Sequence, residues 1–378
     1  GKYWDNKTHW IASRAKFERE RELTKALNDL KAEIEDKYLQ DRKAGEIEKT
    51  WLKSTIDKIY HPEKYKKDQP RTLFEFIQHF IDRTDDRNPV CYKQKREYSR
   101  TFQYLKDFCE EKGREYDFQD IDLDFYEDWV AWLNKKNLAR NTVGKKVQTL
   151  KIFLNYAAEK GMPVNRQYKS HRFKNLSEES EAIYLNEKEL DQIHKLDLAE
   201  APGQEKVRDI FLIGCWTGCR FSDLAQVTRR NIKDGMIFIT QGKTGNKVWI
   251  PMHHVVKEIL EKHDFEIPPM ITNQKFNEAL KKIAKKAKIN EPVHKKITRG
   301  GVTRSTEYKK WQLVTSNTAR RSFATNLYKS GFPSISIMQI TGHKTEAAFL
   351  KYIKVTSEEH AKMLQAHWQK NAGHLKVV

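Results

Sequence analysis

From Thr72 to about Gly161 the apolar residues recur every three or four positions, and the pattern is helical throughout. This spacing places them along one face of successive α-helices, since a helix completes a turn in 3.6 residues. The apolar stripe of the last segment is formed by Val143, Val147, Leu150 and Leu154. We therefore predict a helix bundle over residues 67–168.

The amino-terminal region, residues 1–66, predicts two helices of its own. Glu, Lys, Arg, Leu and Ala predominate over 13–43, which indicates one long exposed helix ended by Gly45. A second helix is predicted over 47–60. Residues 61–70 then carry a proline near each end and a run of charge, which is typical of a linker.

The pattern changes after the bundle. Residues 166–181 lack apolar periodicity and are predicted to form a linker. Asn186 and Glu189 then form a capping box, in which each side chain satisfies the backbone N–H of the other residue, so a helix is expected to begin there. A second such pair, Thr356 and Glu359, opens the last predicted helix.

Part of the carboxyl-terminal region has a different period. In GMIFITQGKTGNKVWIPM, residues 235–252, apolar residues alternate on both sides of Gly-Lys-Thr-Gly, which predicts a β-hairpin. The basic segment HKKITRGGVTRSTEYKKW, residues 294–311, is predicted to be a turn-rich connection between helices. The expected fold class is mainly α with a small β-hairpin or sheet: a helical bundle followed by an α+β domain over 178–378.

The chain carries 71 Lys and Arg against 52 Asp and Glu, a formal charge of +19 over 378 residues. This excess favours nucleic acid as the partner, with a chain that is basic only for solubility as the alternative. The four cysteines show neither a C-x-x-C pair nor the spacing of a disulfide framework or zinc site, which indicates a reducing, cytosolic setting. No apolar run approaches the ~20 residues of a membrane span, and the sequence has no secretory signal or phosphate-binding loop.

Several polar side chains stand where the chain geometry is expected to expose them. In WTGCRFSDL, Gly218 is expected to end one helix and Ser222 to cap the next, which leaves Arg220 on the turn between them. Arg320 is expected in the first turn of a later helix, where free backbone N–H groups favour an anion. Two arginines so placed would clamp one phosphate.

Three more residues follow the same logic. Lys243 lies at the tip of the predicted hairpin, and His343 follows Gly342 at the end of an apolar helix. Tyr352 comes nine residues later, in what is predicted to be a short helix. Taken singly, each has an ordinary explanation: helix-end carbonyls for the histidine, a surface ion pair for a cation, and a place in the core for the tyrosine, because Phe349 beside it is apolar.

As an ordered set these residues resemble the tyrosine recombinases, the phage-integrase family, and most nearly the integrases of conjugative transposons and prophages. That family has an Arg in a T-G-x-R turn, a Lys in a β-hairpin, a His-x-x-Arg helix start, a Gly-His pair and a tyrosine nine residues later. The corresponding stretches here are TGCR, QGKTGNKVWIP, ARRSFATNLY, TGHK and YIKV. The resemblance covers most of the chain and implies a core-binding, SAM-like domain over 67–168 and a catalytic domain over 178–378.

The resemblance implies a site-specific recombinase or integrase that integrates and excises a mobile element. Tyr352 would attack a phosphodiester to form a 3′-phosphotyrosine, and Lys243 would protonate the departing 5′ oxygen. A phenol has a pKa of about 10, so Arg220, Arg320 and His343 would supply the positive field that favours its attack. Double-stranded DNA, a homo-tetramer and accessory DNA-bending proteins are the implied partners, with no membrane, no cofactor and no metal. The implied location is the bacterial cytoplasm, at the nucleoid.

Two departures from the family pattern bear on function. Where the family has His-x-x-Arg, this chain has Asn317 ahead of Arg320, and an amide cannot accept and return a proton as an imidazole does. The base role would then pass to water or to the phosphate itself. In the family a three-stranded sheet precedes a YWD segment, whereas this chain opens at Gly1 with YWD at 3–5, as a fragment or processed form would. We therefore expect the sheet to be missing and residues 1–66 to be a partial arm-binding region.

DNA contacts are expected from one basic edge of the bundle and from the basic segment of the second domain. The side chains predicted to face DNA are Arg140, Asn141, Thr142, Lys145, Lys146, Lys151, Arg299 and Arg304. The carboxyl-terminal helix, with Met363, Leu364 and Trp368, either docks on a neighbouring subunit or packs on its own domain.

Three alternatives stay open. A helix-turn-helix regulator is suggested by residues 320–343 with Gly331 in the turn, although Ile335 and Ile337 are apolar where base contacts need polar side chains. A DNA-binding relative silenced by Asn317 would keep the fold without the chemistry. A type IB topoisomerase shares the chemistry, but the separate helix bundle favours a recombinase.

Overall fold

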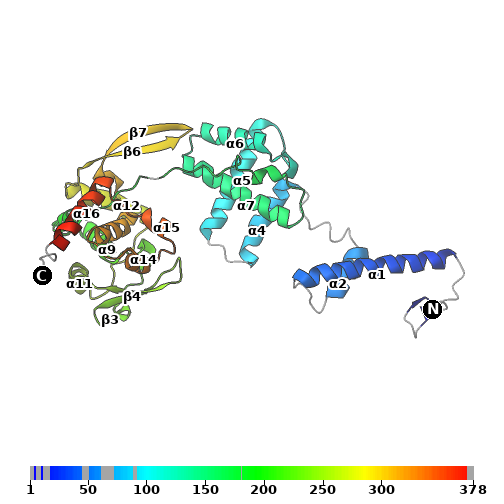
Figure 1. The fold of residues 1–378 in the computed structure, drawn as a ribbon, viewed down its shortest axis with the longest axis horizontal. Helices are drawn as coiled ribbons and strands as arrows, with labels where there is room; N and C mark the ends of the chain where they lie inside the picture. The colour runs from blue at the N-terminus through cyan, green and yellow to red at the C-terminus, as the bar shows by residue number, and fades with distance from the viewer. Residues whose placement is uncertain are drawn as a thin grey trace. The chain divides into compact units, whose positions relative to one another are not determined.

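The computed structural model describes residues 4–5, 10–11, 18–44, 51–60, 72–87, 92–179 and 181–372. They fall into two compact units, one within residues 1–133 and 142–176 and the other within 134–141 and 177–378. Helices predominate and the sheets are small and antiparallel, which confirms the predicted fold class (Figure 1). Among the described residues no helix is both long and apolar enough to cross a membrane.

The amino-terminal region contains the two predicted helices and, in addition, two short paired strands that the sequence did not predict. The elements are β1 (Trp4–Asp5), β2 (Trp10–Ile11), α1 (Glu18–Ala44) and α2 (Trp51–Tyr60). The expected starts of the two helices, at 13 and 47, lie outside the described residues. The Trp51 indole N–H donates to Asp41 at 2.7 Å and its ring meets the edge of Tyr38, so the start of α2 packs on α1.

A four-helix bundle follows, as predicted. Its elements are α4 (Leu73–Arg87), α5 (Tyr92–Lys112), a 3₁₀ turn η1 (Phe118–Asp120), α6 (Leu123–Lys135) and α7 (Arg140–Glu159). The predicted stripe of α7 is completely buried. The Phe80 ring lies 5.5 Å from Tyr98 and 5.4 Å from Phe153, and each such pair adds about 1 kcal/mol beyond its burial. Aromatic packing therefore holds this bundle together.

The first part of the predicted linker 166–181 is folded, so that prediction is wrong for those residues. A 3₁₀ turn, η2 (Arg166–Lys169), follows α7, and Tyr168 and Phe173 are buried. The Phe173 ring lies 4.6 Å from that of Tyr126. These two aromatics have no helical spacing because they sit in turns, which is why the sequence pattern did not reveal them.

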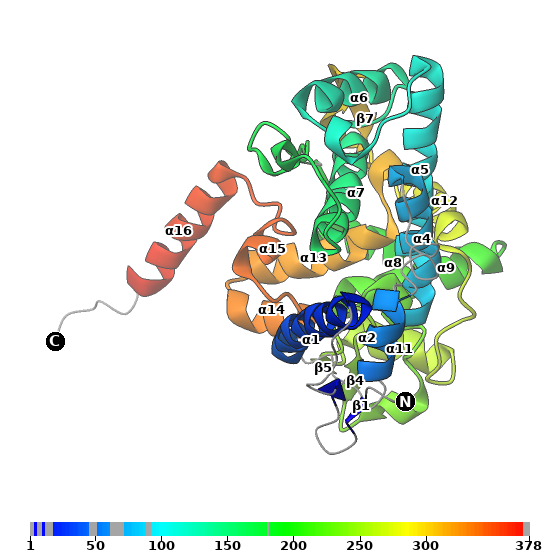
Figure 2. The ribbon, with the colours of Figure 1, turned by 90° about the vertical axis from the view of Figure 1, so that its right-hand side faces the viewer.

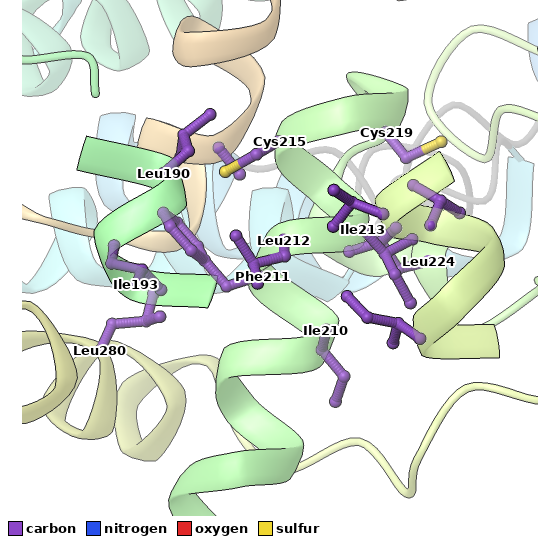
Figure 3. Packing of buried hydrophobic residues seen from close by; sticks show 14 of the residues in the cluster. Leu190, Ile193, Ile210, Phe211, Leu212, Ile213, Cys215, Cys219, Leu224 and Leu280 are labelled. Atoms are coloured by element: carbon purple, nitrogen blue, oxygen red, sulfur yellow. The ribbon is translucent and has the colours of Figure 1, made fainter. Parts of the chain in front are cut away.

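The second unit begins with helices and a small sheet. These are α8 (Glu187–His194), α9 (Pro202–Thr217), α10 (Phe221–Leu224), η3 (Arg229–Asn231), β3 (Ile232–Lys233), β4 (Met236–Thr240), β5 (Lys247–Pro251), α11 (His254–Lys262) and α12 (Asn273–Lys286). The predicted hairpin is confirmed as β4–β5, with β3 added at its edge. α9 is the central helix: Figure 3 shows its Phe211 toward Leu190 and Ile193 of α8 and its Ile213 beside Leu224 of α10.

The chain then forms a long hairpin and four further helices. These are β6 (Pro292–Arg299), β7 (Val302–Lys309), η4 (Lys310–Leu313), α13 (Ser316–Lys329), α14 (Ser334–Thr341), α15 (Glu346–Leu350) and α16 (Ser357–Ala372). α13, α14 and α15 lie together around Phe323, Ile337 and Phe349 (Figure 2). This cluster places the carboxyl ends of α14 and α15 beside α13.

The prediction of a turn-rich connection over 294–311 is wrong, because these residues form most of the β6–β7 hairpin. The ribbon is largely exposed, so its strands lack the apolar alternation that marks a half-buried strand. Carboxylates of Glu178 and Glu181 accept the backbone N–H groups of Thr298 (at 3.1 Å) and Lys296 (at 3.2 Å). They satisfy donors on the outer edge of β6.

The helix-start predictions have mixed outcomes. Both capping boxes are confirmed, at α8 by mutual bonds of 2.8 and 3.0 Å and at α16 by bonds of 2.9 and 3.2 Å. The prediction that Ser222 caps α10 is wrong. Arg220 occupies the N-cap position, and its side chain makes no cap bond. Gly218 does end α9, in the left-handed conformation with φ +67°.

Lys146 is the clearest disagreement within the bundle. Predicted on a basic edge, it is 3% exposed and its ammonium donates to Glu97 at 2.8 Å and to Thr101 at 3.4 Å. A buried cation needs such partners, because desolvation without them is costly. Lys146 is therefore a structural residue of the bundle.

We expect Lys146→Met to lower the free energy of unfolding of this bundle by about 2 kcal/mol, since it leaves the part-buried Glu97 without its cation. Native-state hydrogen exchange of the α5 and α7 amides measures this locally. The exposed neighbour Lys145, changed to Met, is the control and should shift stability by less than about 0.5 kcal/mol. Equal losses in the two variants would contradict the burial argument.

Candidate active site

Arg220 is held at the junction of α9 and α10. Its Nη1 donates to the side-chain oxygen of Gln241 at 2.9 Å and lies 3.7 Å from a carboxylate oxygen of Asp223. A side chain on Gly218 would collide with the ring of Phe323, so the turn that presents Arg220 requires glycine there.

Arg320 lies in the second turn of α13, one turn later than predicted. It is 2% exposed, and its guanidinium donates to the carbonyl oxygen of Gly218, at 2.6 Å, and to that of Thr341. Its Nε–H is buried and bonds none of the described residues. Burial, and then the nearby charge of Arg220, lower the pKa of Arg320 to about 10, so it remains a cation at neutral pH.

His343 follows the end of α14, as predicted, and its hydrogen bonding defines its tautomer. Its Nδ1 lies 2.8 Å from the hydroxyl of Thr341, whose single proton is donated to the Ile337 carbonyl at 2.6 Å. Nδ1–H must therefore be the donor, which leaves a lone pair on Nε2 of the neutral ring. Burial, and then the charges of Arg320 and Arg220, lower the pKa of His343 to about 4.

Tyr352 lies in the turn after α15, which ends at Leu350, so the prediction that it belongs to the helix is wrong. Its carbonyl accepts a hydrogen bond from the Thr325 hydroxyl at 3.2 Å. Its ring centroid is 4.6 Å from that of His343 and 5.8 Å from the guanidinium carbon of Arg320. Phe349 fills the core, whereas Tyr352 is only partly buried.

The structure thus brings together four of the six predicted residues. Arg220, Arg320, His343 and Tyr352 converge from four separate segments of the chain. Lys243 is exposed in the β4–β5 turn and Asn317 is exposed near the start of α13, and neither bonds to that group within the described residues. With a pKa lowered to about 4, His343 is neutral at pH 7, so within this group of four residues the positive charge comes from the two arginines.

One residue of this site was missed. Gln241 is 3% exposed and connects Arg220 to the carbonyl of Ile340 in α14, to which its amide donates at 3.1 Å. A signal was present: Ile237 and Ile239 point inward along β4, and Gln241 is a polar residue at the next inward position.

The predicted DNA-facing side chains differ in their exposure and in their contacts within the protein. Thr142, Lys145, Arg299 and Arg304 are exposed, and Arg140 is half-buried. Asn141 uses its amide in both directions on the backbone of Glu178, at 2.9 and 3.0 Å. Burial near the Phe173 ring lowers the pKa of Lys151, and Lys146 is buried. Asn141 and Lys146 therefore have partners within the protein, and the prediction that Lys146 lies on an exposed basic edge is wrong.

Comparison with known proteins decides the family. A model of the phage integrase SAM-like domain matches residues 72–175, and a model of the phage integrase family matches 183–359. Tyrosine recombinase XerC of Pediococcus pentosaceus is 24% identical over 277 residues, which are 68% of this chain and 87% of the relative. XerC of Staphylococcus saprophyticus is 23% identical over 269 residues, 65% and 84% of the two chains.

The chain is a tyrosine recombinase. It is accordingly a site-specific recombination enzyme of the tyrosine type.

Solved structures agree on the fold of this recombinase. A lambda integrase dimer bound to a COC′ core site superposes with a TM-score of 0.57 at 16% identity, over 75% of this chain and 95% of that one. The Tn1549 transposon integrase in complex with transposon right end DNA gives 0.57 at 17% identity, over 80% and 99%. In the described part of the recombinase no group of three or more His, Cys, Asp or Glu side chains is arranged to hold a metal ion.

The lowered pKa of His343 predicts a stability effect in the DNA-free recombinase. Between about pH 6.5 and 4 the unfolded chain protonates this residue and the folded chain does not, so its contribution is complete above that window and is lost as pH falls through it. The wild-type protein should lose more thermal stability between about pH 7 and 5 than His343→Gln. Parallel pH dependences of the two unfolding midpoints would refute the burial of a neutral imidazole.

Proposed function

We propose that this recombinase cleaves and rejoins DNA through a 3′-phosphotyrosine on Tyr352, in the integration and excision of a mobile element. The observation that carries the proposal is the position of the Tyr352 ring, beside His343 and the guanidinium of Arg320. A partly exposed phenol beside a buried cation is suited to attack a phosphate.

Arg220 and Arg320 form the proposed phosphate site. The charge of Arg220 lies close enough to Arg320 to disfavour the charged form of that second guanidinium. Among the described residues, the carboxylate paired with Arg220 is that of Asp223, at 3.7 Å. An anion placed between the two cations would remove that repulsion. The unbonded Nε–H of Arg320 supplies a donor for one of its oxygens.

The proposed chemistry is a transesterification. The Tyr352 oxygen forms a bond to phosphorus while the bond from phosphorus to the 5′ oxygen breaks, and Lys243 gives that oxygen a proton. Asn317 cannot take the phenol proton, and the lone pair on Nε2 of His343, whose ring lies 4.6 Å from that of Tyr352, is the proposed acceptor. A 5′-hydroxyl of a partner strand then attacks the phosphotyrosine and releases Tyr352.

Double-stranded DNA and a homo-tetramer are the proposed partners. The lambda integrase has been solved as a tetramer bound to a Holliday junction, with a TM-score of 0.55 to this chain. α16 projects from its domain (Figure 2), and its Leu364 and Trp368 are 48% and 63% exposed. The first turn of α16 packs on its own domain, where Glu359 accepts from Lys329 at 2.7 Å, and the exposure of the later residues favours docking of the rest of the helix on a neighbouring subunit. Accessory DNA-bending proteins, and action in the bacterial cytoplasm at the nucleoid, follow from the proposed substrate.

The domain roles are part of the same proposal. We assign core binding of DNA to residues 67–168, catalysis to 178–378 and arm-type contacts to the region 1–66. A helix-turn-helix regulator is disfavoured, because Ile335 on α14 is 74% exposed where base reading needs polar groups. Covalent trapping distinguishes an active recombinase from a DNA-binding relative that Asn317 has made inactive.

Covalent trapping tests the chemistry. Incubated with nicked suicide DNA carrying attachment sites, the wild-type protein should give an adduct that survives denaturant, and Tyr352→Phe should give none. Asn317→His should speed adduct formation by about 10²-fold, because it restores an imidazole to the family position. Tight binding without an adduct in either the wild type or Asn317→His would sink the recombinase mechanism for this chain.

Salt dependence of DNA binding tests the predicted contacts. Lys145→Ala and Arg304→Ala should each weaken binding to all sequences and reduce the slope of log K against log salt by about 0.9, if each neutralises one phosphate. Lys146→Met, which removes a buried cation of the same bundle, is the matched control and should leave the slope unchanged. A reduced slope for Lys146→Met would show that this lysine reaches DNA after all.

A further inference from the structure

Gln241 uses all of its side-chain polar groups inside the protein. Its oxygen accepts from Arg220 Nη1 and from the Thr244 hydroxyl, both at 2.9 Å, and its amide nitrogen donates to the Ile340 carbonyl at 3.1 Å. A buried amide with these three bonds has one orientation, because reversing it would oppose donor to donor and acceptor to acceptor.

The backbone of Gln241 also organises the turn that carries Lys243. Its N–H donates to the Asn246 carbonyl at 2.9 Å, and its own carbonyl accepts from the N–H groups of Thr244, at 3.3 Å, and Gly245, at 2.8 Å. Gly242, Lys243, Gly245 and Asn246 of this turn are exposed, and Thr244 is half-buried. Main chain and side chain of one residue thus tie the Lys243 turn to Arg220.

Gly342 shows how closely the α14 end is fitted to this amide. A Cβ on Gly342 would lie 1.9 Å from the side-chain oxygen of Gln241, and the residue has φ +65°. Any other residue at 342 would displace the amide from its partners. Since His343 follows directly, the same amide sets the backbone that presents the imidazole.

We propose that Gln241 is a positioning residue that couples the Lys243 turn, Arg220 and the end of α14, so that the leaving-group proton donor and the phosphate clamp are aligned together. This inference rests on the proposed function for the roles of Lys243 and Arg220. It makes Gln241 act through its neighbours, without touching DNA.

Two substitutions separate the contacts. Gln241→Ala removes all three side-chain bonds. Gln241→Glu keeps an acceptor for Arg220 but replaces the donor to the Ile340 carbonyl with an oxygen, which releases α14 alone. The matched control is Gln274→Ala on the exposed face of α12, where the glutamine contacts only Glu278 among the described residues.

Hydrogen exchange without DNA tests the coupling independently of activity. In Gln241→Ala, the amides of Gln241 and Gly245 in the turn, and those of Gly342 and His343 after α14, should exchange faster than in the wild type. In Gln241→Glu only the α14 pair should do so, and Gln274→Ala should change neither. Unchanged exchange in Gln241→Ala overturns the proposal, whether or not the protein cleaves DNA.

Cleavage kinetics test the positioning role. Gln241→Ala should slow adduct formation by about 10²-fold on suicide DNA with a normal 5′ oxygen, a loss expected when a catalytic group is misplaced by about 1 Å. With a 5′-bridging sulfur the leaving group needs no proton, so the part of the loss that comes from Lys243 should disappear and the part from Arg220 remain. A merely structural defect would slow both substrates equally, and that result, or wild-type rates on both, counts against the proposal.

Gly342→Ala completes the set. If its effect acts through Gln241, Gly342→Ala and Gln241→Ala combined should be no slower than the slower single variant, whereas independent effects would multiply. Multiplying defects overturn the coupling. If the wild type forms no adduct on any DNA, the proposed function fails, and the exchange experiment alone decides whether Gln241 holds the turn.

Discussion

The guanidinium of Arg320 is the contact on which the site depends, because it joins segments that are distant in the sequence. It donates to the carbonyl of Gly218 beyond α9 and to that of Thr341 at the end of α14, and its carbon lies over the ring of Tyr352. Carbonyls at helix carboxyl ends lack intrahelical partners and carry partial negative charge, so they suit a buried cation. The bonds that fold the site therefore also place its charge.

The electrostatic balance around Arg320 follows from this burial. Two arginines lie close together with one carboxylate, Asp223, near them, and one oxygen of that carboxylate is itself without a hydrogen-bond donor among the described residues. Burial, and then the charges of the two arginines, keep His343 neutral at pH 7, so it adds no positive charge to the DNA-free site. Within the described part of the chain, Asp223 is the carboxylate that partly balances the two cations.

Much of the fold was predictable because it depends on local pattern. Apolar spacing predicted the bundle and its α7 stripe, alternation predicted β4–β5, and the capping boxes predicted the starts of α8 and α16. The errors arise where tertiary partners decide. Lys146 is buried because Glu97 pairs with it, and Arg220 rather than Ser222 occupies the N-cap position of α10. The β6–β7 ribbon is largely exposed and shows no apolar alternation, so its sequence predicts turns instead of strands.

The site shows the same division. The order of Arg220, Arg320, His343 and Tyr352 indicated the family, but not that Tyr352 lies beyond its helix or that a glutamine joins the hairpin to α14. The hydrogen bond that sets the tautomer of His343 depends on Thr341, two residues earlier, and on a helix carbonyl. These contacts depend on the tertiary structure, so the sequence pattern alone does not reveal them.

The β6–β7 ribbon has a consequence for self-association. A two-stranded sheet leaves a row of unpaired backbone groups on each side, which other chains can extend by adding a strand. Along β6 the carboxylates of Glu178 and Glu181 occupy two of these donors. An incoming strand would have to displace both acids, which disfavours strand addition on the β6 side while the ribbon keeps its basic surface exposed.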